Sequence, residues 1–199
     1  MARIKVYGDS ISGNCLKVKW TLDHLGIAHD WIETGVLDGA TRTPEFLALN
    51  GAGQVPLVLL EDGRPLAQSN AILLHVAEGS ALIPADRYDR AKMLEWLFWE
   101  QYSHEPYVAV ARFQVKYRGL SPADLAPDLI ADAYRALRRL EEALQGRAFL
   151  VGETCTLADI SLIAYTRMAP DGGLDLAPYL AVRAWIARVE AAIAIPPLA

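Results

Sequence analysis

The sequence predicts a mixed α/β domain followed by an all-α helical domain. Segments with the apolar pattern of strands occur only in the first part of the chain, where they alternate with segments of helical pattern. Beyond Pro84, the patterned segments repeat apolar residues at helical spacing. We therefore expect one domain over residues 1–81 and a second over residues 86–199, with a linker around Pro84.

The first domain is expected to contain its elements in the order β-α-β-α-β-β-α. Ile4 and Val6 alternate with charged residues, as in a half-buried strand. The pair Asp62-Gly63 predicts a two-residue hairpin loop, because both positions favour a positive φ. The expected strands cover residues 2–7, 29–33, 55–60 and 65–67, and the expected helices run from Asn14 to Leu25, over residues 44–49, and from Ser69 to near Gly79.

The second domain is expected to consist of four helical stretches. Pro106 lacks a backbone N–H, so it should interrupt the first of them. Thr156 and Asp159 have the spacing of a capping box, in which each side chain accepts a hydrogen bond from the other residue's backbone N–H. We assign both residues to folding, with Cys155 as a packing residue beside them. The expected helices cover residues 86–118, 128–145, 156–168 and 179–193.

Composition excludes several classes of function. The 199 residues include 19 Lys and Arg against 24 Asp and Glu, a net charge of −5, which argues against a nucleic-acid partner. Cys15 and Cys155 are far apart and show no metal-ligand spacing, so we expect no metal site. No run approaches the ~18–20 apolar residues of a membrane span, and the first residues do not resemble a signal peptide. We expect a cytoplasmic protein without a membrane partner.

The dipeptide Val55-Pro56 opens an apolar run that resembles a strand. Proline cannot donate to a sheet, so it belongs at an edge, at the first strand position or at a bulge. A cis bond would leave the backbone N–H and C=O of Val55 to pair with a short extended peptide. On statistics alone the trans form is favoured, because about 5–6% of such bonds are cis.

Two helix starts offer places for an anion. Gln68 and Ser69 precede a helix whose first N–H groups would suit a carboxylate, although Ser69 could equally cap its own helix. The loop after the first strand ends in Ser12, Asn14 and Cys15 at another helix start, where a hydroxyl or a thiol would feel the helix dipole. The alternative for this loop is a set of ordinary turn and cap residues.

Five segments together resemble the cytosolic glutathione transferase family, in order and across the whole chain. They are Ser12 to Val18, Thr43 to Asn50, Gln54 to Leu57, Gln68 to Ile72 and Leu157 to Ile160. The resemblance, which is to bacterial serine-type members of a theta- or nu-like class, implies a thioredoxin-like N-terminal domain and an all-helical C-terminal domain. It also implies a cis Val55–Pro56 bond and a homodimer.

The same resemblance implies roles for individual residues. Val55 would pair its backbone with the cysteinyl part of glutathione, next to Pro56 and Gln54, while Gln68 and Ser69 would hold the γ-glutamyl carboxylate. Ser12 would donate a hydrogen bond to the glutathione sulfur, but a one-residue gap in the comparison would bring Asn14 or Cys15 to that position. A pocket for the electrophile is expected between the domains, near Ile11, Tyr102, Tyr107 and Arg112.

The function implied is a detoxifying transferase that joins the glutathione thiolate to an electrophilic small molecule. Glutathione would be a co-substrate, and no tightly bound cofactor is expected. One alternative is a glutathione-dependent thiol-disulfide oxidoreductase that uses Cys15. A second alternative is a non-catalytic module that binds glutathione or another ligand.

Overall fold

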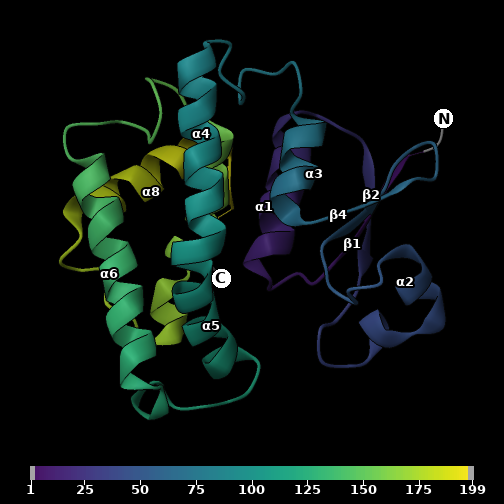
Figure 1. Cartoon of the computed structure of the whole chain (residues 1–199), viewed down its shortest axis with the longest axis horizontal. Helices are drawn as coiled ribbons and strands as arrows, with labels where there is room; N and C mark the ends of the chain where they lie inside the picture. The colour runs from purple at the N-terminus through teal and green to yellow at the C-terminus, as the bar shows by residue number, and fades with distance from the viewer. Residues whose placement is uncertain (1–2, 197–199) are drawn as a thin grey trace. The chain divides into compact units, whose positions relative to one another are not determined.

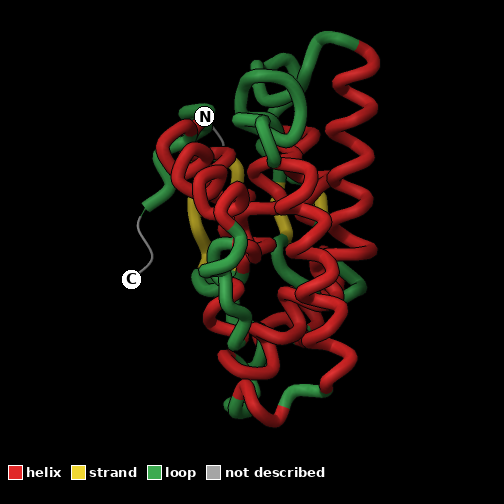
Figure 2. Tube along the Cα trace, turned by 90° about the vertical axis from the view of Figure 1, so that its left-hand side faces the viewer, coloured by secondary structure: helices red, strands yellow, loops and turns green. Residues whose placement is uncertain are grey.

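The structure is a computed structural model that describes residues 3–196 of the chain. Its internal contacts divide the chain into two compact units between Ser80 and Ala81. Within the described residues, all strands belong to the first unit, and the second contains helices and their connections (Figure 2). The expected fold class, a mixed α/β part followed by an all-helical part, is confirmed.

The first unit follows the expected order of elements. Its sheet has the strand order β2-β1-β3-β4, with β1 parallel to β2 and β3 antiparallel to both β1 and β4. The predicted beginning of the first strand at residue 2 lies outside the described residues. The elements are β1 (Ile4–Gly8), α1 (Gly13–His24), β2 (His29–Glu33), α2 (Pro44–Leu49), β3 (Leu57–Leu59), β4 (Pro65–Ala67) and α3 (Ser69–Val76), with a short 3-10 turn, Ala40–Arg42, before α2.

Helices cover the two faces of this sheet unequally (Figure 1). Because successive side chains of a strand point to opposite faces, the side chains of Val6 and Tyr7 lie on opposite faces of the sheet. Val6 is fully buried, as are Val18 of α1 and Ile72 of α3, and α1 and α3 pack against each other. On the other face, the Tyr7 ring meets Phe46 of α2 edge to face, with ring centroids 6.0 Å apart. The main core of the unit therefore lies between the sheet and α1 with α3.

The hairpin between β3 and β4 differs from the prediction. Of the pair Asp62-Gly63, only Gly63 has a positive φ, +85°. The Leu60 N–H donates to the carbonyl oxygen of Arg64 at 2.9 Å, which encloses a three-residue loop. The Asp62 carboxylate accepts from the Arg64 N–H at 3.0 Å, a local bond that fixes this longer turn. The expected two-residue loop is wrong.

The second unit consists of helices and two short 3-10 turns. The expected interruption of its first helix is present, but it lies just before Pro106, as a π-helical turn over Glu100–His104. Pro106 has no N–H for the carbonyl of the preceding turn, and the wider turn accommodates this loss. The helices are α4 (Arg87–Trp99), α5 (Glu105–Lys116), α6 (Pro127–Leu144), α7 (Leu157–Thr166) and α8 (Leu180–Ala192), and the 3-10 turns are Pro122–Asp124 and Ala169–Gly172.

Helix α7 is the centre of the second unit, because every one of its residues is buried. The predicted capping box of Thr156 and Asp159 is present at its start. The Asp159 carboxylate also accepts hydrogen bonds from the Leu150 N–H at 2.9 Å and from Nε1 of Trp185 at 2.8 Å. Asp159 therefore ties the cap of α7 to a neighbouring loop and to α8, and its structural assignment is supported by these contacts.

Cys155 lies next to this cap and is half-buried. Burial raises the pKa of its thiol well above the usual range, so the thiol is protonated at neutral pH. Over residues 3–196, no helix is long and apolar enough to cross a membrane.

Replacing Asp159 by alanine should lower the free energy of unfolding by about 3 kcal/mol or more, because several buried donors lose their acceptor. Urea denaturation followed by tryptophan fluorescence measures this change. Asp124→Ala, which removes an exposed aspartate of the same unit, is the matched control and should change the unfolding free energy little. Equal stabilities of the two variants would contradict the central role of Asp159.

Candidate functional site

Three chain segments meet at one edge of the sheet. Tyr7 of β1 stands opposite Leu57 of β3, and Leu57 stands opposite Ala67 of β4. Because β3 is antiparallel to both neighbours, the end of β1, the beginning of β3 and the end of β4 lie side by side. The loop with Ser12, the segment with Val55 and the helix start with Ser69 therefore converge on this edge.

Ser12 is the residue that caps the beginning of α1. Its N–H donates to the carbonyl of Asp9 at 3.0 Å, and its own carbonyl accepts from the N–H of Leu16 at 2.9 Å. Its side chain makes no capping hydrogen bond, although the residue is only 9% exposed. The hydroxyl thus lies at the positive end of a 12-residue helix without being used to close that helix.

Cys15 lies in the core beneath the same turn and is fully buried. Burial raises the pKa of its thiol to about 11, against the opposing effect of hydrogen bonds from the Ser12 hydroxyl and the Asp9 backbone. The thiol is therefore protonated and shielded at neutral pH, which is unfavourable for a nucleophile. These properties argue against the alternative in which Cys15 carries out disulfide exchange.

Asn14 and Ser69 connect two helix starts. The Ser69 hydroxyl donates to Oδ1 of Asn14 at 3.0 Å, across 55 residues of sequence. The cap residue of α3 is Gln68, and Ser69 is the first residue of the helix proper. The alternative in which Ser69 caps its own helix is therefore wrong. Its hydroxyl instead joins the beginning of α3 to the beginning of α1.

Gln68 has a backbone conformation that few residues other than glycine adopt, with φ +68° and ψ +110°. Its carbonyl accepts from the N–H of Ile72 at 3.0 Å, so the residue is held between β4 and the first turn of α3. Its side chain is exposed. Such conformations often occur at functional sites, where the surrounding structure maintains them.

The Val55–Pro56 peptide bond is cis, as the resemblance implied. Nδ2 of Asn50 donates to the carbonyl of Gln54 at 2.8 Å and fixes the segment that leads to it. Sheet pairing begins only at Leu57. Among residues 3–196, no hydrogen bond is formed by the N–H or C=O of Val55. Both groups therefore remain for pairing with an extended ligand.

The residues expected near an electrophile are distributed over both units. Ile11, in the first unit, and Tyr102, in the second, are exposed, whereas Tyr107 is half-buried. Arg112 requires a correction. Its side chain is almost fully buried in the helical unit, and its Nε donates to Oδ2 of Asp171 at 3.1 Å. The 3-10 turn that carries Asp171 approaches α5 closely, and this packing encloses the guanidinium.

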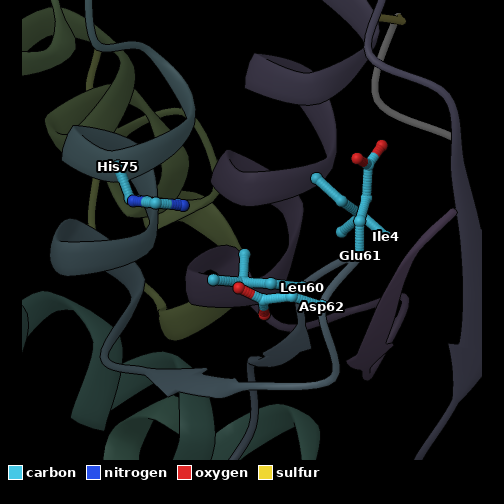
Figure 3. Close-up of a pocket in the computed structure, with 5 residues that line it drawn as sticks. All are labelled: Ile4, Leu60, Glu61, Asp62 and His75. Atoms are coloured by element: carbon cyan, nitrogen blue, oxygen red, sulfur yellow. The ribbon is translucent and has the colours of Figure 1, made fainter. Parts of the chain in front are cut away.

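Two cavities of the first unit lie apart from the predicted site residues. One, of about 280 Å³, is lined by residues near the beginning of β1, the β3–β4 loop and α3 (Figure 3): Ile4, Leu60, Glu61, Asp62 and His75. The other, of about 200 Å³, lies between the sheet and α2 and includes Tyr7, Thr34 and Phe46. Neither is lined by a residue assigned to glutathione, whose expected place is the open edge of the sheet.

Sequence reasoning missed two side chains at this edge. Glu33 ends β2, and Oε1 of Glu33 accepts from the N–H of Ser10 in the β1–α1 turn at 2.9 Å. Oε2 of the same carboxylate accepts from Nε1 of Trp31 at 2.8 Å. The sequence signal that could have identified Glu33 is its position at the end of a strand, since β1 and β2 are parallel and their carboxyl ends lie at the same edge.

The fold and the edge geometry define a two-part protein in which an open sheet edge can hold an extended peptide and a separate part is helical. Family comparisons agree with this class. Residues 11–78 match the model described as Glutathione S-transferase, N-terminal domain, and residues 100–192 match Glutathione S-transferase, C-terminal domain. The chain belongs to the glutathione S-transferase family and is a glutathione-using transferase with a thioredoxin-like first domain.

Individual relatives support the same assignment. Glutathione S-transferase 3 of Zea mays is 30% identical, over 99% of this chain and 97% of its own. A crystal structure of a glutathione S-transferase from Pseudomonas fluorescens is 44% identical and superimposes with a TM-score of 0.93, over 98% of both chains. The disulfide-bond oxidoreductase YfcG of Escherichia coli is 26% identical, over 87% of this chain and 84% of its own.

Cys15 should be almost unreactive in the native protein. With a pKa of about 11, fewer than roughly one Cys15 thiol in a thousand is ionised near neutral pH. Burial also restricts the access of a reagent to this thiol. In a Cys155→Ala variant, Cys15 is the remaining cysteine, so a chromogenic disulfide reagent should release little of its coloured thiolate until the protein is unfolded. The native rate should increase as the pH rises toward 11. A rapid native reaction at neutral pH would restore the oxidoreductase alternative.

Proposed function

We propose that this protein conjugates the sulfur of glutathione to an electrophilic small molecule, with Ser12 stabilising the thiolate. The observation that carries the proposal is the Ser12 hydroxyl, which lies at the beginning of α1 and does not cap the helix. A hydrogen-bond donor at the positive end of a helix favours an anion beside it. This proposal includes the serine-type mechanism that the sequence suggested.

Cys15 supports Ser12 in this arrangement. The Ser12 hydroxyl donates to the Cys15 sulfur in the structure. When glutathione binds, this O–H would turn to donate to the glutathione sulfur, and the protonated Cys15 thiol would donate its S–H to the serine oxygen in exchange. Since burial raises the pKa of Cys15, its thiol remains a donor throughout the neutral range. The side-chain oxygen of Asn14 accepts from Ser69, which ties Asn14 to the beginning of α3.

The chemistry requires no strong base. A free thiol has a pKa of about 8.5, and one hydrogen bond with a helix dipole can lower it by about one or two units. Each unit is worth ~1.4 kcal/mol and raises the thiolate concentration close to tenfold. The thiol proton goes to solvent, the sulfur forms a bond to the electrophilic carbon, and the leaving group departs with its electron pair.

Residues around the sheet edge would hold the tripeptide. Val55 would exchange backbone hydrogen bonds with the cysteinyl residue, and the first N–H groups of α3 would receive the γ-glutamyl carboxylate together with Ser69 and Gln68. Gln54 would lie alongside the peptide, and Pro56 would maintain the course of the chain beside it. The support is the convergence of these segments at one edge.

Ser12→Ala should lower kcat about tenfold or more and leave the KM for glutathione within about twofold, because the lost interaction is with the thiolate. The apparent pKa of bound glutathione, from the pH dependence of kcat, should rise. The sign follows from the lost donor, which stabilised only the charged form. Initial rates with a chromogenic aryl halide provide both values.

Ser69→Ala is the contrasting variant. Loss of the Ser69 hydroxyl should raise the KM for glutathione several-fold and leave the pKa of the bound thiol unchanged, because Ser69 would contact the γ-glutamyl carboxylate of glutathione and not its sulfur. A Ser12→Ala variant with wild-type rates, or wild-type protein that binds glutathione without turnover, would contradict the proposal. The second result would favour a binding module.

We also propose that the protein acts as a homodimer, which is typical of its family. Phe98, in the last turn of α4, and Tyr102, four residues later in the π-helical turn, are 72% and 84% exposed. Large exposed aromatic side chains that lie together commonly mark an interface.

Phe98→Asp should therefore shift the protein toward a monomer in sedimentation velocity. Tyr88→Asp, at another exposed aromatic residue of α4, is the matched control and should leave the sedimentation coefficient unchanged. If neither variant alters a dimer, the interface lies elsewhere. If the wild-type protein sediments as a monomer, the dimer proposal is wrong.

A further inference from the structure

We propose that Glu33 is a positioning residue that fixes the turn carrying Ser12, an inference that rests on the proposed role of Ser12. Glu33 belongs to the strand next to β1, and it has no place among the residues that the sequence assigned to glutathione or to the electrophile. Its role would be to orient another residue rather than to touch the reacting atoms.

Both carboxylate oxygens of Glu33 are occupied. Oε1 accepts from the Ser10 N–H at 2.9 Å, and Oε2 accepts from Nε1 of Trp31 at 2.8 Å. Partial burial acts to raise the pKa of the Glu33 carboxyl, but the hydrogen bonds from Trp31 and from the backbone and hydroxyl of Ser10 outweigh it, and the pKa lies below its usual range. The group is an ionised acceptor at neutral pH, and charge-assisted bonds of this kind are the stronger ones.

Trp31 is itself fixed by the backbone of β1. A Cβ atom at Gly8 would clash with the Trp31 ring, so the indole rests directly against the end of that strand. The Thr34 N–H donates to the Gly8 carbonyl at 2.8 Å and extends the junction between the two strands. The ring that orients Glu33 therefore has little freedom to move.

A short path leads from Glu33 to Ser12. Within the turn, the Asp9 carboxylate accepts from the Ile11 N–H at 2.9 Å, and the Asp9 carbonyl accepts from the Ser12 N–H at 3.0 Å. These bonds hold the turn together internally. The bond from Ser10 to Glu33 attaches it to the neighbouring strand, 23 residues away in sequence. Without that attachment, the turn and the Ser12 hydroxyl could shift as a unit, and a displacement of about 1 Å is sufficient to slow a reaction.

The test compares Glu33→Ala with Glu33→Gln and with Glu61→Ala. We expect Glu33→Ala to lower kcat about tenfold with the KM for glutathione within about twofold, and to raise the pKa of the bound thiol. Glutamine retains one acceptor oxygen, so Glu33→Gln should recover a substantial part of kcat. Glu61 is an exposed glutamate of the β3–β4 loop, and its removal changes the charge equally with no expected effect on turnover.

The thiol pKa should also be measured by the ultraviolet absorbance of the thiolate in the glutathione complex, which needs no electrophile. If Glu33→Ala lowers only the melting temperature and leaves this pKa and kcat as in wild type, Glu33 is purely structural and the inference is overturned. A wild-type complex whose thiol pKa is not lowered would instead overturn the proposed role of Ser12. Failure of the Glu33 inference is therefore seen in the Glu33→Ala variant, and failure of the proposed Ser12 role is seen in the wild-type protein.

Discussion

The backbone pairing of β1 is the constraint on which the rest of the candidate site depends. Val6 stands opposite Trp31 of β2 on one side and opposite Val58 of β3 on the other, so the position of β1 is fixed from both directions. A shift of one residue would turn its buried side chains toward the opposite face of the sheet. It would also move the turn that follows β1 away from the segment that precedes β3. The core and the site edge are therefore set by the same register.

Burial decides how the polar residues of the first turn are used. Ser12 and Cys15 are separated by less than one turn of α1; Ser12 keeps 9% of its surface exposed at the helix start, and Cys15 is fully enclosed. The buried thiol is kept neutral, and a neutral thiol can support the serine as a donor instead of competing with it as a nucleophile.

The sequence was sufficient for the order of elements, because alternation and helical spacing are local properties. It was insufficient where a side chain far along the chain decides the outcome. The cis bond before Pro56 followed only from family resemblance, since the residues themselves favour trans. The full burial of Cys15, the buried state of Arg112 beside Asp171, and the hydrogen bond of Glu33 across 23 residues all depend on distant parts of the chain.

The π-helical turn at Glu100–His104 changes the direction in which every following side chain of the helix points. Each residue of an α-helix advances the facing direction by about 100°, so a wider turn redirects every side chain that follows it. Before the turn, α4 packs against α7, and after it α5 packs against α6 and the 3-10 turn Ala169–Gly172 as well as α7. One nearly continuous rod thereby serves two sets of neighbours, and deleting a single residue from this turn would rotate α5 out of alignment with its own partners.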